Sequence, residues 1–188
     1  DEMRKLLIAT SNLGKLKEYK VLLGGLPFDL AMLTDVGIHE PAEEVGTTFE
    51  ENARDKACIA ARHSGLLAIA DDSGLEVDVL NGEPGIFSAR YAGENASDEE
   101  RVQYLLSKLA VVPWEGRNAR FRCAIAIADP EGVLAVVDGT CEGRIAFQPK
   151  GHNGFGYDPI FFIPSLGRTL AELSQEAKNE CSHRGEAA

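Results

Sequence analysis

The stretch Leu66-Leu-Ala-Ile-Ala-Asp-Asp-Ser-Gly74 decides the fold, because an apolar run passes directly into two adjacent acids. The five apolar residues predict a buried strand, which we expect to end at Ala70. Strand ends are common places for catalytic carboxylates in α/β proteins. Two adjacent carboxylates repel each other unless a cation or another partner is present. Asp71 and Asp72 are therefore candidates for a site that holds a hard divalent cation such as Mg²⁺.

A second candidate segment, Thr10-Ser-Asn-Leu-Gly-Lys15, joins a predicted strand over Lys5–Ala9 to a predicted helix over Lys15–Leu23. Backbone N–H groups and a lysine at the start of a helix suit an anion. The segment is not a Walker A motif, because only Gly14-Lys15 is present. An ordinary turn between strand and helix is the alternative.

The next helix is predicted by capping-box patterns that begin at Thr47 and Thr48, and it should extend to about His63. Asn52 and Lys56 fall on the edge of its apolar stripe. An amide and an ammonium there are costly in a dry core. Either the Lys56 stem extends to water, or this face of the helix borders a polar pocket.

Strands and helices alternate irregularly over the remaining chain. A helix is predicted from the Ser97 cap, and the strands between residues 119 and 147 resemble an antiparallel meander. Further strands are predicted over Phe28–Met32 and Leu75–Val79, and a last helix over about Leu170–Glu180. We therefore expect an α/β fold with a mixed central sheet flanked by helices.

Two segments near the end of the chain depart from the pattern of a simple apolar core. In Gly151-His-Asn-Gly-Phe-Gly-Tyr-Asp158, glycines flank aromatic residues, and such a loop can present a ring that stacks on a base. A glycine-rich turn with a core aromatic is the alternative. Lys178 and Ser182-His183-Arg184 form a cationic cluster, which could also complement the dipole of a helix C-terminus.

The composition limits the partners of the chain. Its 188 residues predict one domain, and 30 acids against 19 bases give a formal net charge of −11. This charge argues against nucleic acid as a partner but leaves open a small phosphorylated ligand held by a few cations. No apolar run approaches a membrane span or the core of a signal peptide, and the four cysteines are scattered singly. We therefore expect free thiols, no membrane partner and a cytoplasmic location. An apparent helix start at 185–188 predicts a terminal helix.

Six motifs in register resemble the inosine triphosphate pyrophosphatase family, from Ile8 to Gly185. Each of them could occur by chance, but their order along the chain is highly specific. The motifs are Ala9-Thr-Ser-Asn-x-x-Lys15, Glu43-Glu-x-Gly-x-Thr-Phe-x-Glu-Asn52, Ala70-Asp-Asp-Ser-Gly-Leu75, Pro84-Gly-x-x-Ser-Ala-Arg90, Gly154-Phe-Gly-Tyr-Asp-Pro159 and Ser182-His-Arg-Gly185.

This resemblance implies a single nucleoside-triphosphate pyrophosphatase domain over residues 1–188, with a substrate cleft between two lobes, and a homodimer. It implies Mg²⁺-dependent hydrolysis of ITP, dITP and XTP to the monophosphate and pyrophosphate, which cleanses the nucleotide pool. A related house-cleaning pyrophosphatase for a pyrimidine or modified nucleotide is the nearest alternative. A nucleotide-binding regulatory module without turnover is the second.

The resemblance also implies roles for individual residues. Asp72 should act as general base and, with Glu43 or Glu44, bind Mg²⁺. The triphosphate should be held by Lys56 and by Thr10, Ser11, Asn12 and Lys15. Further contacts to substrate are implied for Ser73, Arg90, Phe155, Gly156, Tyr157, Asp158, Lys178, His183 and Arg184.

Overall fold

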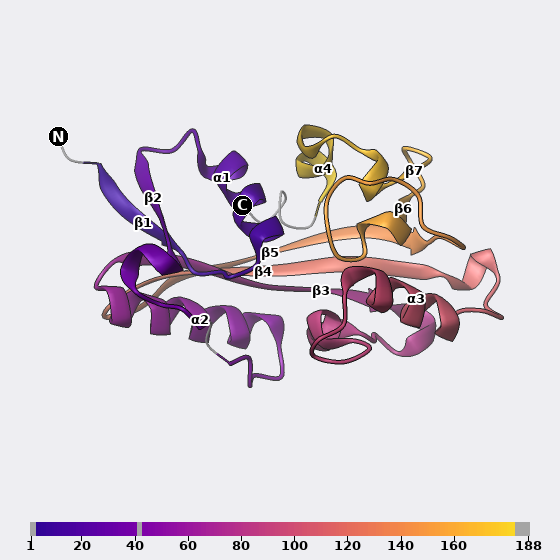
Figure 1. Ribbon diagram of the computed structural model, residues 1–188, viewed down its shortest axis with the longest axis horizontal. Coiled ribbons are helices and arrows are strands. Elements are labelled where there is room, and N and C mark those ends of the chain that lie inside the picture. The colour runs from indigo at the N-terminus through magenta and orange to yellow at the C-terminus, as the bar shows by residue number, and fades with distance from the viewer. Residues whose placement is uncertain (1–2, 41–42, 183–188) are drawn as a thin grey trace. The chain divides into compact units, whose positions relative to one another are not determined.

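The computed structural model describes residues 3–40 and 43–182, and within these ranges it forms an α/β fold with a seven-stranded sheet (Figure 1). The strand order is β2-β1-β3-β4-β5-β6-β7. The strands are β1 (Arg4–Ile8), β2 (Phe28–Met32), β3 (Leu67–Val77), β4 (Asn118–Asp129), β5 (Gly132–Ile145), β6 (Phe161–Ile163) and β7 (Arg168–Thr169). The α-helices are α1 (Leu13–Leu23), α2 (Phe49–Ser64), α3 (Asp98–Lys108) and α4 (Gln175–Cys181). Short 3₁₀ helices are η1 (Leu33–Val36), η2 (Asp78–Leu80), η3 (Gly85–Arg90), η4 (Trp114–Gly116), η5 (Asp158–Ile160) and η6 (Leu170–Glu172).

The sheet is mixed, which confirms the predicted fold class. Strand β1 runs parallel to both β2 and β3, with Leu6 opposite Leu30 and Leu67. Strands β5, β6 and β7 pair antiparallel. The neighbouring strands β4 and β5 are separated by two residues only, and so short a turn joins antiparallel strands.

The described residues form two compact units. Unit 1 comprises the chain up to Asp72 together with Cys123–Gly139, and unit 2 comprises Ser73–Arg122 and the chain from Thr140 onward. A cleft between two lobes stays a prediction.

In unit 1, successive side chains of a strand point in turn to the face covered by α1 and to the face covered by α2. Leu6 and Ile8 of β1 pack against Leu16 and Tyr19 of α1. Leu7, which lies between them in the sequence, is fully buried and points to the other face. Figure 1 shows α1 and α2 on opposite sides of these strands. The buried stripe of α2 consists largely of alanines, which allow its backbone to lie close to the strands.

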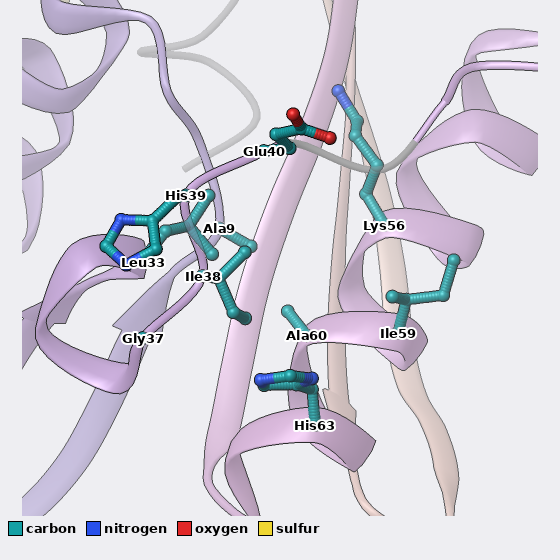
Figure 2. A pocket seen from close by; sticks show the side chains of 10 residues that line it. All are labelled: Ala9, Leu33, Gly37, Ile38, His39, Glu40, Lys56, Ile59, Ala60 and His63. Atoms are coloured by element: carbon teal, nitrogen blue, oxygen red, sulfur yellow. The ribbon is translucent and has the colours of Figure 1, made fainter.

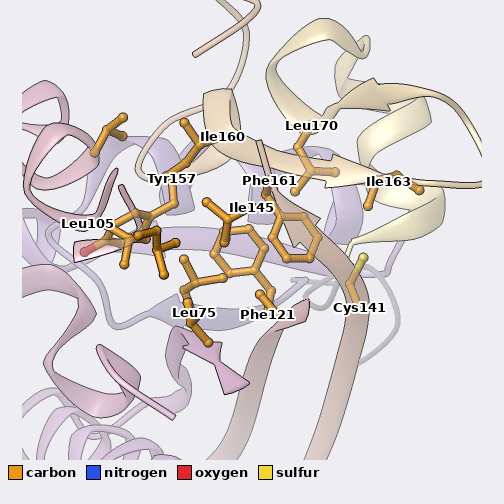
Figure 3. Packing of buried hydrophobic residues seen from close by; sticks show 14 of the residues in the cluster. Leu75, Leu105, Phe121, Cys141, Ile145, Tyr157, Ile160, Phe161, Ile163 and Leu170 are labelled. Atoms are coloured by element: carbon orange, nitrogen blue, oxygen red, sulfur yellow. The ribbon is translucent and has the colours of Figure 1, made fainter. Parts of the chain in front are cut away.

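Unit 2 has its own apolar core, in which α3 and the chain around α4 contact the ends of the long strands (Figure 3). The rings of Phe121 on β4 and Phe161 on β6 lie 4.5 Å apart between centroids. Leu75, Leu105 and Ile145 are fully buried around them. Each such side chain stabilises the fold by roughly 1.5–3 kcal/mol, so this core can hold nearby loops in place.

Three predicted elements differ from the structure. Strand β3 does not end at Ala70 but continues through both acids to Val77. Where the sequence predicts two strands, over Val133–Thr140 and around Gly143–Phe147, the structure has the single strand β5, which runs through Gly143 to Ile145. A Cβ on residue 143 would lie 2.7 Å from the Phe161 ring, so glycine allows β6 to pack closely. The predicted helix over Leu170–Glu180 is divided, because Ser174 caps a new helix at Ala177 N–H.

Other local predictions are confirmed. Thr48 caps α2 by accepting a hydrogen bond from Glu51 N–H, and Ser97 forms a capping box with Glu100. The four cysteines are free thiols. Among the described residues, no helix is both long enough and apolar enough to span a membrane. The predicted terminal helix start at 185–188 lies outside these residues.

Candidate functional site

The continuous strand β3 places Asp71 and Asp72 on opposite faces of the sheet, because successive side chains alternate. Asp71 shares its face with Ile69, which packs against α1. Asp72 shares its face with Ala70 and meets α2. Both acids are almost completely buried, with 2% and 3% of their surface exposed. The two carboxylates therefore have different partners.

On the α1 side, Asp71 binds Lys15. The Lys15 ammonium lies 3.0 Å from Asp71 Oδ1, and the Cys123 thiol donates to Asp71 Oδ2 at 3.5 Å. Asn12 caps α1 by accepting from Lys15 N–H at 3.1 Å. The end of β1 lies beside this part of β3, since Ala9 N–H donates to Ile69 O. The predicted anion segment is thus adjacent to the paired acids, and its lysine is held by a carboxylate.

On the α2 side, Asn52 connects Asp72 to the loop before the helix. Asn52 Nδ2 donates to Asp72 Oδ2 at 2.9 Å, while Asn52 Oδ1 accepts from Gly46 N–H at 2.8 Å. A Cβ on residue 46 would lie 2.7 Å from Asn52 Oδ1, so glycine is needed for this close approach. Through this amide, α2 fixes both the carboxylate and the loop that bears Glu44.

Lys56, one turn further along α2, forms an ion pair with Glu44. Its ammonium lies 2.7 Å from Glu44 Oε1, and only 12% of the lysine side chain is exposed. Burial alone would lower the pKa of Lys56, but the carboxylates of Asp71, Glu44 and Asp72 outweigh burial and raise it. Lys56 therefore stays charged beside acids and does not extend to water. Of the two interpretations open from the sequence, the structure supports a polar environment at this helix face.

The carboxyl group of Asp72 has a pKa well above its usual value. Burial, and next the negative charge of Glu44, raise the pKa of Asp72 to about 6. The Lys56 ammonium, the Asn52 amide and Lys15 act in the opposite direction but do not restore the usual value. A carboxyl group that titrates close to neutral pH in a buried position is typical of a functional site.

The oxygen atoms of Glu44 and Asp72 fit a hard divalent cation. Burial and the negative charge of Glu44 both raise the pKa of Asp72, and an additional positive charge beside the two carboxylates would stabilise the ionised form of Asp72. Mg²⁺ commonly takes one or two carboxylates and fills its remaining positions with water and substrate phosphates. Within residues 3–40 and 43–182, no three His, Cys, Asp or Glu side chains gather into a group that could hold a metal. Glu43 is exposed, so of the two adjacent glutamates it is Glu44 that the structure brings to Lys56 and Asp72.

A pocket of about 310 Å³ lies beside Lys56 in unit 1 (Figure 2). Figure 2 shows the Lys56 ammonium and the Glu40 carboxylate toward one end and His63 toward the other. Its wall is largely apolar and includes Ile38 and Ile59. The stem of Lys56 thus contributes to an apolar surface while its ammonium binds Glu44.

In unit 2 the predicted nucleoside-binding residues form a second buried ion pair. The Lys178 ammonium lies 2.6 Å from Asp158 Oδ2, and both side chains are at most 4% exposed. Phe155 N–H donates to the same carboxylate oxygen at 3.0 Å, and Lys178 Nζ lies 4.6 Å from the centroid of the Phe155 ring. Gly154 adopts a φ of +72°, and a Cβ there would collide with Asp158 Oδ2. The loop is thus folded tightly around Asp158, with Phe155 against the lysine.

Two further contacts hold this loop. Gly156, with a φ of +61°, donates its N–H to Asp98 Oδ2 at 2.9 Å. The Tyr157 hydroxyl donates to Ser88 O at 2.7 Å, and burial raises the pKa of Tyr157. Neither partner was predicted as part of the site.

The remaining predicted residues have more varied surroundings. Thr10 and Ser11 follow β1, and Thr10 Oγ1 accepts from Asn12 N–H at 3.1 Å. Ser73 follows Asp72 on β3 and is half-buried. Arg90 ends η3, and its guanidinium lies 5.2 Å from the centroid of the Phe87 ring. His183 and Arg184 lie outside the described residues.

The sequence did not predict the roles of three residues that orient or hold the candidate site residues. Asn52 orients Asp72, Asp71 holds Lys15, and Asp98 holds Gly156. The unusual placement of Asn52, four residues before Lys56 on one helix edge, was a signal for the first. Nothing in the sequence pointed to Asp98, because its partner is 58 residues away.

Comparison with known proteins identifies the family to which this fold belongs. Residues 6–188 match the Ham1 family, and the chain belongs to this family. The family assignment made from the six motifs is thereby confirmed.

Among its relatives is a dITP/XTP pyrophosphatase of Geobacter sulfurreducens, which is 54% identical over 185 residues and aligns across 98% of this chain and 93% of that protein. A dITP/XTP pyrophosphatase of Bacillus subtilis is 46% identical over 185 residues, covering 98% and 93%. The solved structure of a HAM1 protein from Coxiella burnetii superimposes with a TM-score of 0.88 at 46% identity, covering 98% of this chain and 94% of that one.

Proposed function

We propose that this protein is a Mg²⁺-dependent pyrophosphatase that hydrolyses the noncanonical purine nucleoside triphosphates dITP, XTP and ITP to the monophosphate and pyrophosphate. The observation that carries the proposal is the buried Asp72 carboxyl, whose pKa is raised to about 6 beside the ion pair of Lys56 and Glu44. A binding module needs no such group. The names of the relatives support the purine substrates.

Asp72 would act on the water molecule that attacks the α-phosphorus. As the bond from water oxygen to phosphorus forms, the bond from the α-phosphorus to the bridging oxygen breaks and pyrophosphate leaves. The proton of the water passes to the Asp72 carboxylate and then to solvent. A base of pKa about 6 suits this task, because it is mostly ionised at neutral pH yet still accepts a proton readily.

The positive charges of unit 1 would hold the triphosphate. Lys56, and Lys15 next to the N-terminus of α1, would attract phosphate oxygens. Mg²⁺ held by Glu44 and Asp72 would neutralise further phosphate charge. Asn52 would keep the Asp72 carboxylate in one orientation, since its amide is fixed at both ends.

The loop of unit 2 would bind the purine. Phe155 would stack on the base, which adds affinity for any purine. The Lys178 ammonium, which lies beside this ring, would donate a hydrogen bond to the 6-keto oxygen of hypoxanthine or xanthine. The amino group of adenine would face this donor without a partner, and an unpaired buried polar group gives strong discrimination.

A substrate panel tests this proposal. We expect pyrophosphate release from dITP, XTP and ITP in the presence of Mg²⁺, much slower release from dATP and dTTP, and loss of activity in EDTA. Release of orthophosphate in place of pyrophosphate would contradict the proposed bond cleavage. Preference for dTTP would favour a pyrimidine house-cleaning enzyme.

The same proposal includes the assembly and location. We expect a homodimer in the cytoplasm that does not bind nucleic acid, which the net charge of −11 disfavours. Light scattering would measure the mass of the assembly, and a fluorescent duplex would report any binding of nucleic acid.

A further inference from the structure

Asp98 reaches from helix α3 to the loop that carries Phe155. As the first residue of α3, it accepts a hydrogen bond from Gly156 N–H through Oδ2, at 2.9 Å. Its other oxygen, Oδ1, accepts from Arg101 Nη2 at 2.7 Å. The carboxylate therefore joins two elements of unit 2 that lie far apart in the sequence.

Arg101 fixes Asp98 in turn. Besides the ion pair, its Nη1 donates to Ala96 O at 2.6 Å and to Ala89 O at 3.1 Å. Only 17% of the Arg101 side chain is exposed. The planar guanidinium thus binds both Asp98 Oδ1 and the loop before α3, and Asp98 Oδ2 stays directed at Gly156.

The charged form of Asp98 is maintained in this arrangement. Partial burial favours the neutral carboxyl, but the hydrogen bonds from Arg101 and from Gly156 N–H outweigh burial and lower the pKa of Asp98. The bond to Gly156 is therefore charge-assisted, and such bonds are shorter and stronger than neutral ones.

The loop needs this support because glycines flank its aromatic residue. Gly154 and Gly156 both have positive φ, a region that glycine enters freely. Because glycine has many accessible backbone conformations, fixing this loop in one conformation costs more conformational entropy than fixing other residues. Asp158 fixes Phe155 N–H from within the loop, and Asp98 fixes Gly156 N–H from outside it. These bonds hold two consecutive backbone N–H groups and thereby define the direction of the Phe155 side chain.

We propose that Asp98, held by Arg101, is a positioning residue that orders the Phe155 loop for the purine base. This inference rests on the proposed function, which places the base on Phe155. Asp98 would act on affinity at the base end of the substrate and leave the chemistry at Asp72 unchanged.

The test compares Asp98→Ala with Glu99→Ala, a control that removes one exposed acid from the same first turn of α3. We expect Asp98→Ala to raise the KM for XTP roughly tenfold, as for the loss of one charge-assisted hydrogen bond, with kcat within about twofold of the wild type. Calorimetry should show XMP binding weakened to the same degree and pyrophosphate binding unchanged. Glu99→Ala should match the wild type in all three measurements.

A double-mutant cycle with Phe155→Ala separates positioning from general destabilisation. In the Phe155→Ala background, Asp98→Ala should raise the KM by less than about twofold, because the ring that Asp98 positions is absent. Asp98→Asn keeps an oxygen that accepts from Gly156 and should recover most of the affinity. Asp98→Ser, whose side chain is shorter, takes the place of Asp98→Ala in the cycle if that variant does not fold.

Two results would overturn the positioning role: a KM for Asp98→Ala equal to that of Glu99→Ala, or an equal loss with and without Phe155. Failure of the wild type to hydrolyse dITP, XTP and ITP would instead remove the proposed function itself.

Discussion

The buried lysines of the two units, Lys56 and Lys178, differ in the negative charge that they face. Lys178 lies 2.6 Å from Asp158, a carboxylate that also receives the Phe155 N–H. Lys56 lies 2.7 Å from Glu44 and also experiences the charges of Asp71 and Asp72. The first arrangement keeps a loop in place. The second holds more negative charge than its lysine balances. Burial, together with this excess charge, raises the pKa of Asp72, and the excess would favour a further cation.

Removal of the Asp72 charge should give the largest effect. We expect Asp72→Asn to lower turnover of dITP with Mg²⁺ by roughly a thousandfold, because the amide can neither accept the proton of water nor bind the cation with a full charge. Pyrophosphate release measures it. The control is Asp55→Asn, an exposed acid on α2 that should retain wild-type turnover. Near-normal turnover of Asp72→Asn would refute the role of this residue.

Substitution of Lys178 should lower the free energy of unfolding more than substitution of Lys56. Lys178→Met removes the ammonium that lies 2.6 Å from the buried Asp158 carboxylate, and we expect a loss of about 3–5 kcal/mol in the free energy of unfolding. Lys56→Met should cost far less stability, because 27% of the Glu44 side chain is exposed and water can solvate it. Lys56→Met should instead weaken substrate binding and raise the KM. Urea unfolding of both variants, with Ile59→Met on the exposed part of α2 as control, measures the difference. Equal losses would contradict the comparison.

The dependence of stability on pH should report the raised pKa of Asp72 directly. The pKa of Asp72 rises from 3.8 to about 6 on folding, so the folded state binds this proton more tightly than the unfolded state. Its contribution to stability is present below about pH 4 and is lost as the pH rises through about 6. In EDTA at pH 7, Asp72→Asn should therefore be more stable than the wild type by roughly 3 kcal/mol.

That difference should disappear near pH 4, and saturating Mg²⁺ should stabilise the wild type more than Asp72→Asn. Urea unfolding at a series of pH values provides the measurement. A wild type that stays more stable than Asp72→Asn at pH 7 in EDTA would show that Asp72 is not destabilised by its surroundings.

The smallest expected effect distinguishes Glu43 from Glu44. Glu44→Gln should raise the Mg²⁺ concentration for half-maximal activity roughly tenfold, since it removes one charged oxygen ligand. Glu43→Gln should change it by less than about twofold, because Glu43 is exposed. A titration of activity with Mg²⁺ compares the two variants, each of which removes one charge from the same loop. A reversed order would assign the cation to Glu43.

Local patterns predicted much of the fold. The capping residues Thr48 and Ser97 gave the starts of α2 and α3, because a cap depends on neighbours within four residues. The predicted strand over Phe28–Met32 has the observed bounds. The end of the strand at Ala70 was wrong for a physical reason. Adjacent acids normally interrupt a strand, but here Lys15 and Asn52 satisfy them from opposite sides, and both partners are distant in the sequence.

The candidate site shows the same limit. The resemblance named Asp72, Lys56 and Glu44, and the structure brings these three together. It named Lys15 for the triphosphate without its bond to Asp71. Which of Glu43 and Glu44 faces Asp72 depends on the path of the loop that Gly46 and Asn52 fix, and no local pattern encodes such a contact.

Because side chains alternate along β3, its odd-numbered and even-numbered residues face opposite sides of the sheet. In the present register, odd-numbered Asp71 meets α1 and even-numbered Asp72 meets α2. Deletion of a single residue between Ala68 and Ala70 would exchange the two faces for every residue that follows. Asp72 would then be presented to Lys15, and α2 would receive the side chain of Ser73. A change in the number of residues in this part of the strand would therefore keep both acids on their present faces only if it added or removed two residues.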